Sequence, residues 1–231
     1  MLPVQEQKKA NRILAIECAV ENGSLALIEG GFVLASTSSE VGLAPSRAEE
    51  LIPAVDLILR KGNLSLKEID LIAVSTGPGS YSGIRIGIAT AIGLKHSLNV
   101  NCIGVPLLEA MALAIGSSDE IMSAVPVGKH DIAFQSFRRN AGDNLESASI
   151  PSAASEQDFL SELRSFGRSK LTAPPSLLER LRARTADEVE LVDAGPALAE
   201  TIGLAAVMSH FDSSSLEPLY VRNQVARPTG F

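Results

Sequence analysis

The sequence has 231 residues, enough for one large domain or two small ones at about 100 to 200 residues per domain. Apolar residues make up 45% of it and charged residues 20%, which is typical of a globular protein and excludes a largely disordered chain. The formal net charge of −7 argues against strong RNA or DNA binding by this chain alone, because neutralising phosphates needs clustered Lys and Arg.

The N-terminal stretch has basic residues before an apolar run, as a signal peptide has. Glu17 interrupts that run after four apolar residues, however, and no other segment approaches the roughly 20 apolar residues that a membrane-spanning helix needs. We therefore expect a cytoplasmic protein whose first residues, about ten of them, form a frayed leader.

Three strands and a helix are predicted next. Residues 12–28 have the pattern of a β-hairpin around an Asn-Gly turn, and the run at 32–38 adds a third strand. A helix is predicted over 46–60, with Ser46 as its N-cap, acidic residues in its first turn and Gly62 as its stop signal.

The following elements alternate between strand and helix. A β-rich run at 70–75 leads into a glycine-rich turn, a helix over 83–98 and another strand over 99–106. The order strand-strand-strand-helix-strand-helix-strand predicts an α/β layer architecture, in which helices lie against a mixed sheet led by a hairpin. We place a subdomain boundary here and expect one subdomain over 1–105 and a second over 106–231.

The second half of the chain has a weaker pattern. A loop or edge region is expected over 140–156, which is rich in Ser, Ala and Asn, and an extended tail is expected over 215–231. The predicted helices cover 106–114, 156–166, 176–184 and 195–211, and the predicted strands cover 121–128, 131–139, 170–173 and 189–194.

Cysteine and histidine usage indicates neither disulfides nor a metal site. Cys18 and Cys102 lie in or beside apolar segments with no CxxC spacing, so we expect two buried, reduced thiols. The histidines are His96, His130 and His210, and none forms the HxxxH pair that places two imidazoles on one helix face.

The glycine-rich turn is the first candidate binding site. Such a turn between a strand and a helix often holds phosphate, because the N–H groups at a helix start point outward. The stretch 77–87 nevertheless lacks the Lys and the Ser/Thr of a P-loop and the spacing of a dinucleotide-binding fingerprint. An anion site and a merely structural turn both remain open for its residues, which are Gly77, Pro78, Gly79 and Ser80.

The glycines that follow have a packing interpretation. Gly83, Gly87 and Ala91 recur at four-residue spacing and clear one face of the predicted helix, so that another backbone can approach closely.

A serine hydrolase is a remote alternative. The stretch 79–83 matches G-x-S-x-G with Ser82 as the nucleophile, and Asp131 or Asp193 and then His210 follow in the required order. The motif follows an opening hairpin and one helix, whereas a hydrolase nucleophile normally follows the fifth strand of a parallel sheet, so this function is disfavoured.

Three stretches together resemble one family. They are ILAIECAVENGSLAL at 13–27, STGPGSYSGIRIGIATAIGLK at 75–95 and LEPLYVRNQVA at 216–226. The resemblance is to the TsaB family, also called YeaZ, of bacterial tRNA threonylcarbamoyladenosine biosynthesis. It implies an actin-like (ASKHA, ribonuclease H-like) α/β fold of two subdomains, each a mixed sheet with flanking helices. The second is degenerate, and its C-terminal helix and tail return to the first.

The resemblance also implies a function. Members of the family are thought to be noncatalytic partners of a catalytic TsaD-type subunit and a TsaE-type ATPase. This implies no catalytic residue and no required cofactor, with ATP binding only at the level of the complex. It further implies a homodimer when the chain is alone, and contact with tRNA only through the complex.

The sequence departs from the family pattern in two places. Glu17 and Cys18 replace the usual Asp-Thr after the first strand, and Glu21 adds another acid; two added carboxylates are expected to repel phosphates. Lys129 and His130 stand near a missing acid and arginine in the second subdomain, which leaves the role of that loop open. The alternative function, a nucleotide-binding actin-fold ATPase or kinase-like enzyme, is therefore disfavoured.

The predicted helices over 46–60 and 83–98 form the candidate partner interface. They follow each other across one strand and are expected to lie side by side, with more apolar residues than one buried stripe requires. In the family, this pair resembles the one that joins its counterpart in a four-helix bundle; the alternative is that its apolar residues are all core. The predicted interface residues are Leu51, Ile52, Val55, Leu59, Ile84, Gly87, Ile88 and Ala91.

Overall fold

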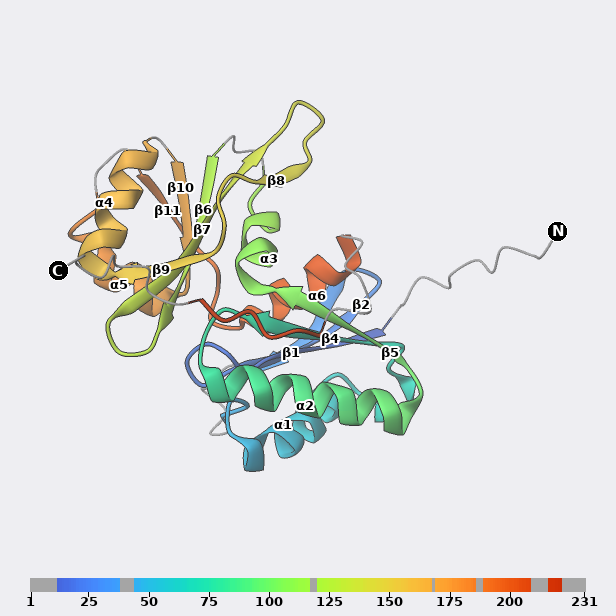
Figure 1. The fold of residues 1–231 in the computed structure, drawn as a ribbon. Coiled ribbons are helices and arrows are strands. Elements are labelled where there is room, and N and C mark those ends of the chain that lie inside the picture. Colours follow the sequence, from blue (N-terminus) through green and yellow to red (C-terminus); the bar gives the residue numbers. More distant parts are fainter. Residues whose placement is uncertain are drawn as a thin grey trace.

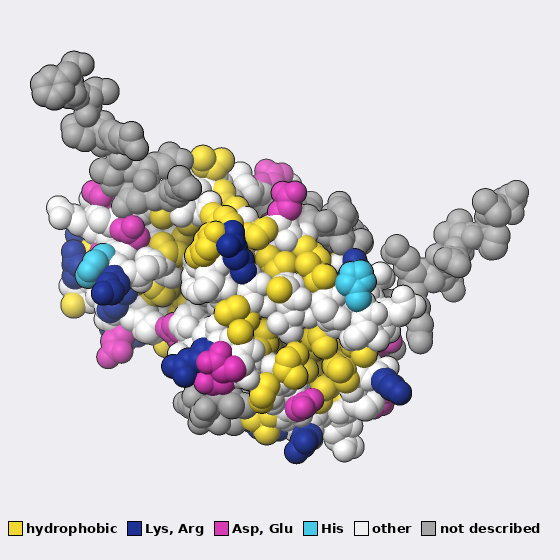
Figure 2. All heavy atoms as spheres, turned by 60° about the horizontal axis from the view of Figure 1, so that its bottom comes forward, with side chains coloured by type: hydrophobic (Ala, Val, Ile, Leu, Met, Phe, Trp, Pro, Cys, Tyr) yellow, Lys and Arg dark blue, Asp and Glu magenta, His cyan; other side chains and the backbone are white. Residues whose placement is uncertain are grey.

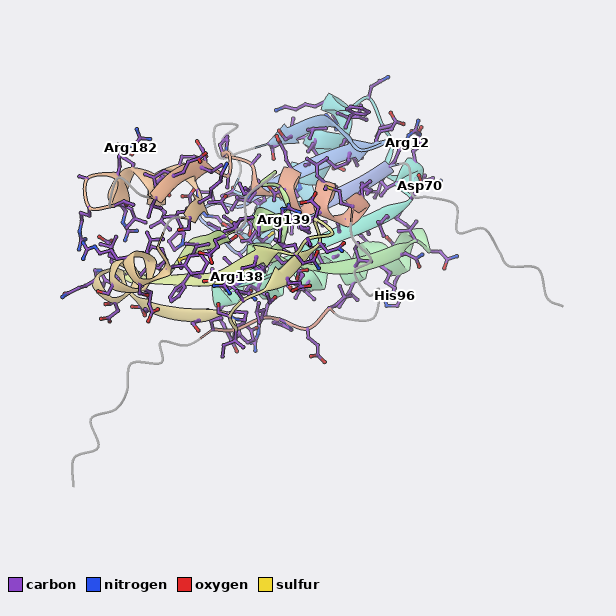
Figure 3. All side chains as sticks on the ribbon, turned by 90° about the horizontal axis from the view of Figure 1, so that it is seen from above. Arg12, Asp70, His96, Arg138, Arg139 and Arg182 are labelled. Carbon is purple, nitrogen blue, oxygen red and sulfur yellow. The ribbon has the colours of Figure 1, made fainter. Side chains whose placement is uncertain are left out.

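Two β-sheets, each with helices packed on it, make up the fold (Figure 1). The computed structural model describes residues 12–37, 44–116, 120–167, 169–185, 189–208 and 216–221. The expected leader, His210 and the end of the tail lie outside these residues. Seen from above, Arg12 and Asp70 lie at one end of the molecule and Arg182 at the other, with Arg139 between them (Figure 3).

The first sheet has five strands in the order β3-β2-β1-β4-β5. The β1–β2 and β2–β3 pairs are antiparallel, whereas β1–β4 and β4–β5 are parallel, as a hairpin followed by helical crossovers requires. The strands are β1 (Arg12–Glu17), β2 (Ser24–Glu29), β3 (Phe32–Thr37), β4 (Leu71–Gly77) and β5 (Asn101–Pro106). This confirms the predicted order of elements up to residue 106.

Helices cover both faces of the first sheet. Helices α1 (Ala48–Lys61) and α2 (Tyr81–Leu98) lie on one face, where α1 contacts β2 and β3 and α2 contacts β4, β1 and β5. Helices α3 (Leu107–Leu113) and α6 (Leu198–Met208) lie on the other, and α6 contacts β1, β2 and β4 although it comes late in the chain. A short 3-10 helix, η2 (Leu66–Glu68), precedes β4.

The second sheet has the order β11-β10-β6-β7-β8, and β9 also pairs with β7. Its inner face packs on α3, and its outer face carries α4 (Glu156–Phe166) and α5 (Pro175–Arg182). Its strands are β6 (Glu120–Val127), β7 (Asp131–Arg139), β8 (Leu145–Ser147), β9 (Ser152–Ser155), β10 (Ser169–Ala173) and β11 (Val189–Asp193).

The predicted starts of helices α1 and α2 were wrong. Helix α1 begins after Arg47, because the Ser46 N–H is bonded to the Asn22 carbonyl at 3.0 Å and Ser46 belongs to the preceding loop. Helix α2 begins two residues earlier than predicted, because the Ser80 hydroxyl caps it by accepting from the Gly83 N–H at 3.3 Å. In addition, the region over 140–156, predicted as a loop or edge region, contains the short strands β8 and β9, which pair with β7.

The glycines of α2 differ sharply in what surrounds them. A Cβ at Gly83 would lie 1.9 Å from the Cys18 carbonyl oxygen, whereas a Cβ at Gly93 would meet nothing within 4 Å. Gly83 therefore marks a close approach of two backbones, as its spacing predicted, and Gly93 does not.

This contrast yields a stability prediction. Gly83→Ala should lower the free energy of unfolding by about 3 kcal/mol or more, because backbone atoms must move to admit the methyl group. Gly93→Ala in the same helix should raise it by about 0.5 to 1 kcal/mol through helix propensity. Urea denaturation of both variants measures the difference, and equal stabilities would show that α2 does not lie against Cys18.

Candidate functional site

The turn between β4 and α2 lies directly on the backbone of the β1–β2 turn. The Ser80 N–H donates to the Ala19 carbonyl at 2.6 Å, and a Cβ at Gly79 would lie 2.3 Å from that same oxygen. The Gly77 N–H donates to the Ser75 hydroxyl at 3.3 Å. Two N–H groups of the candidate anion site are thus bonded within the chain, so neither points free toward a ligand.

The C-terminal tail closes over the same turn. The Leu219 N–H donates to the Thr76 carbonyl at 2.8 Å, at the end of β4. The next residue, Tyr220, accepts a hydrogen bond from Arg85 Nε at 3.0 Å, and its ring centroid lies 5.0 Å from that of Tyr81. The Arg85 guanidinium carbon stands 3.9 Å above the Tyr81 ring, a cation–π contact. The three stretches that carry the family resemblance therefore meet in one place.

Glu17 fills the β1–β2 turn with its own carboxyl group. Its Oε1 accepts hydrogen bonds from the Ala19 N–H at 2.6 Å and the Val20 N–H at 3.0 Å. The side chain is buried, and this burial raises its pKa to about 8, against the lowering effect of the two N–H groups. At pH 7 the group is therefore mainly neutral. Its Oε1 occupies two N–H groups that an anion in this turn would need, and a neutral Glu17 does not supply the repulsion that the sequence suggested for it.

The β1–β2 turn is tied to the second half of the chain. The Ser176 hydroxyl on α5 donates to a Glu21 carboxylate oxygen, and the Ser24 hydroxyl accepts from the Ala199 N–H on α6 at 2.9 Å. The cavity between these parts, lined by Glu17 among others, measures about 10 Å³. That admits about one water molecule and is far too small for a nucleotide.

The predicted partner interface is mostly core. Of the eight predicted residues only Ile52 is exposed, at 48%, because the other seven lie on the faces of α1 and α2 that pack toward the first sheet. The residues that lie buried in the fold are Leu51, Val55, Leu59, Ile84, Gly87, Ile88 and Ala91. As a set, these seven cannot form an exposed patch, and this part of the interface prediction is corrected.

A smaller apolar surface does remain on these helices. Ile52 and Pro53 on α1 and Ala89 and Ile92 on α2 are exposed, the last at 37%. Figure 2 shows hydrophobic side chains gathered on the face where α1 and α2 lie, with charged side chains mainly around them. We call these four residues the α1–α2 surface.

The other candidates do not assemble. Within the described residues no group of three possible metal ligands occurs, and no helix has the length and hydropathy to span a membrane. Cys18 and Cys102 are buried and free, as predicted. The Ser82 hydroxyl lies 3.2 Å from that of Ser80, while Asp193 accepts from the Gly195 N–H at 2.7 Å in the second sheet region. Among the described residues, no Ser-His-Asp triad supports the hydrolase alternative.

This architecture defines a class of protein. Two mixed sheets with flanking helices, and a β1–β2 turn that faces a strand-turn-helix unit, form an actin-like α/β fold. Solved structures agree: YeaZ from Pseudomonas aeruginosa matches with a TM-score of 0.63 at 19% identity, over 91% of this chain and all of that one.

Sequence comparison narrows the class to a family. A family model described as tRNA N6-adenosine threonylcarbamoyltransferase (TsaD) matches residues 39–154, half of the chain. The tRNA threonylcarbamoyladenosine biosynthesis protein TsaB of Escherichia coli is 28% identical over 93% of this chain and 96% of its own length. A threonylcarbamoyltransferase of Desulfovibrio desulfuricans is 35% identical, but over 45% of this chain and only 32% of that protein. The chain belongs to the TsaB (YeaZ) family.

The raised pKa of Glu17 predicts how stability depends on pH. Between the ordinary value of 4.5 and about 8, the folded chain binds more protons than the unfolded chain, so stability falls as pH rises through this window. Glu17→Gln is neutral at every pH, and its amide oxygen can accept the same two N–H bonds. The variant should match the parent within about 1 kcal/mol at pH 5 and be clearly more stable than the parent at pH 9.

Urea denaturation at pH 5, 7 and 9 measures this difference, with Glu49→Gln on exposed α1 surface as the matched control. If parent and Glu17→Gln have the same pH dependence, Glu17 does not carry a raised pKa.

Proposed function

We propose that this chain is a noncatalytic partner subunit in tRNA threonylcarbamoyladenosine modification, which supports a catalytic subunit of the TsaD type. The match to almost the full length of Escherichia coli TsaB is the observation that carries this proposal. The filled turns support it. Glu17 and Ala19 occupy N–H groups where an actin-like nucleotide enzyme would need free donors.

The α1–α2 surface is the proposed interface with the catalytic subunit and, when the chain is alone, with a second copy. An exposed apolar patch on a globular protein usually marks a partner site. A TsaE-type ATPase completes the proposed complex, tRNA binds only through it, and the cytoplasm is the proposed location. The net charge of −7 supports an indirect contact with tRNA.

Reconstitution tests the function. The chain is combined with TsaD-type and TsaE-type proteins from the same source, and threonylcarbamoyladenosine on tRNA is measured by mass spectrometry of nucleosides. The modification should require all three proteins, and the chain alone should neither turn over ATP nor bind Mg-ATP tightly. ATP turnover by the isolated chain would support the enzyme alternative instead.

Two substitutions test the interface. Ile52→Glu and Ile92→Glu each place a charge on the α1–α2 surface at an exposed position, so the melting temperature should change little. Burying an unpaired charge opposes association, so self-association and binding to the TsaD-type subunit should weaken at least tenfold. Light scattering and titration calorimetry measure both effects.

The matched control is Phe32→Glu, which changes an exposed apolar residue at the start of β3. If all three variants bind the TsaD-type subunit equally well, the interface lies elsewhere.

A further inference from the structure

A groove opens on the outer face of the second sheet, between α4 and the segment 149–154. It encloses about 530 Å³, within the range of ligand-binding pockets. Its floor is apolar, with Met122 and Phe134 nearly buried, and Ile150 stands at its edge with 69% of its surface exposed. The proposed tRNA function uses no part of this groove.

The groove is built from well-supported walls. Phe134 in the floor packs edge-on against Phe159 of α4, with 5.2 Å between ring centroids. The opposite wall is fixed to β7, because the Ser136 N–H donates to the Ser149 hydroxyl and Gln135 Nε2 donates to the Ser149 carbonyl, both at 3.0 Å. Little of the structure needs to move for a ligand to enter.

Acidic residues line the α4 side of the groove. Glu156 at the start of α4 is neutralised by Arg180 and Arg184. Asp158 and Glu162 line the groove instead, and no Lys or Arg of the described residues is ion-paired with either. One side of α4 is thus charge-balanced by α5, while the side at the groove keeps two carboxylates over an apolar floor.

The spacing of these groups suits an extended peptide. Asp158, Glu162 and Phe166 are four residues apart and lie along one edge of α4, so they span about 12 Å at 1.5 Å per residue. An extended chain covers that length with about four residues at roughly 3.3 Å each. A small amine would pair with the carboxylates but would leave the apolar part of the groove empty.

We propose that this groove binds an extended segment of a partner protein in which a Lys or Arg lies close to a large apolar side chain. The basic group faces Asp158 and Glu162, and the apolar group lies on the floor beside Ile150 and Phe166. Charge complementarity favours a protein segment over RNA, because the two carboxylates repel phosphates.

Selection from a phage-displayed library of random heptapeptides on the full chain tests the proposal without prior choice of a ligand. Enriched peptides should contain Lys or Arg within about three residues of Leu, Ile or Phe. Fluorescence polarisation with the most enriched peptide should show binding weakened about tenfold by Glu162→Lys and about fivefold by Ile150→Ser.

Both substitutions are at exposed positions, and a thermal melt checks that each variant folds. The matched controls are Glu179→Lys on the exposed surface of α5 and Ile52→Glu on the α1–α2 surface, neither of which should change peptide binding. The absence of enrichment, a consensus without a basic residue, or equal binding to Glu162→Lys would overturn the proposal. Ile52→Glu is expected to weaken binding to the TsaD-type subunit but not to the peptide. The two measurements on this variant therefore distinguish a failure of the groove proposal from a failure of the proposed tRNA function.

Discussion

The contact between the Cys18–Ala19 backbone and the first turn of α2 holds the rest of the structure in place. The Ala19 carbonyl accepts the Ser80 N–H, and the Cys18 carbonyl lies where any side chain at Gly83 would have to be. This contact joins the opening hairpin to the strand-turn-helix unit, and the tail then bonds to the end of β4 beside it. Because the Ser80 N–H already donates to Ala19, it cannot also bind an anion. Packing at this turn therefore competes directly with ligand binding.

Glu17 extends this competition to the β1–β2 turn. A buried carboxyl is costly when charged, but here the group is mainly neutral at pH 7 and accepts two N–H bonds that would otherwise lack partners. Contacts from Glu21 to α5 and from Ser24 to α6 then tie the turn to the other half of the chain. A nucleotide enzyme of this fold needs an opening at this turn so that the ligand can enter. A subunit that only presents surfaces to partners has no such need, and a rigidly held turn suits it better.

Much of the fold could be predicted from the sequence, because strand and helix patterns are local. The order of elements was correct through residue 106, and most later elements were placed within a few residues. The short strands β8 and β9 were missed, since their Ser-rich sequences become strands only by pairing with β7. The site was harder: Leu51 and Ile52 are neighbours with the same apolar character, yet one is fully buried and the other 48% exposed. The sequence pattern identifies which residues of a helix are apolar. Which of them are buried depends on how the helix lies on the sheet, and the pattern alone does not determine that.

The composition of α2 explains why an apolar surface is left outside. Its buried face includes Gly83, Gly87 and Ala91, which bring the helix close to Cys18 and Val74 but bury little side-chain area themselves. Ile84 and Ile88 are buried as well, whereas Ile92 is left 37% exposed. The second subdomain leaves a different surface, a groove with an apolar floor and two carboxylates. Because the two proposed surfaces differ in chemistry, one mainly apolar and the other acidic over an apolar floor, they are expected to select different partners.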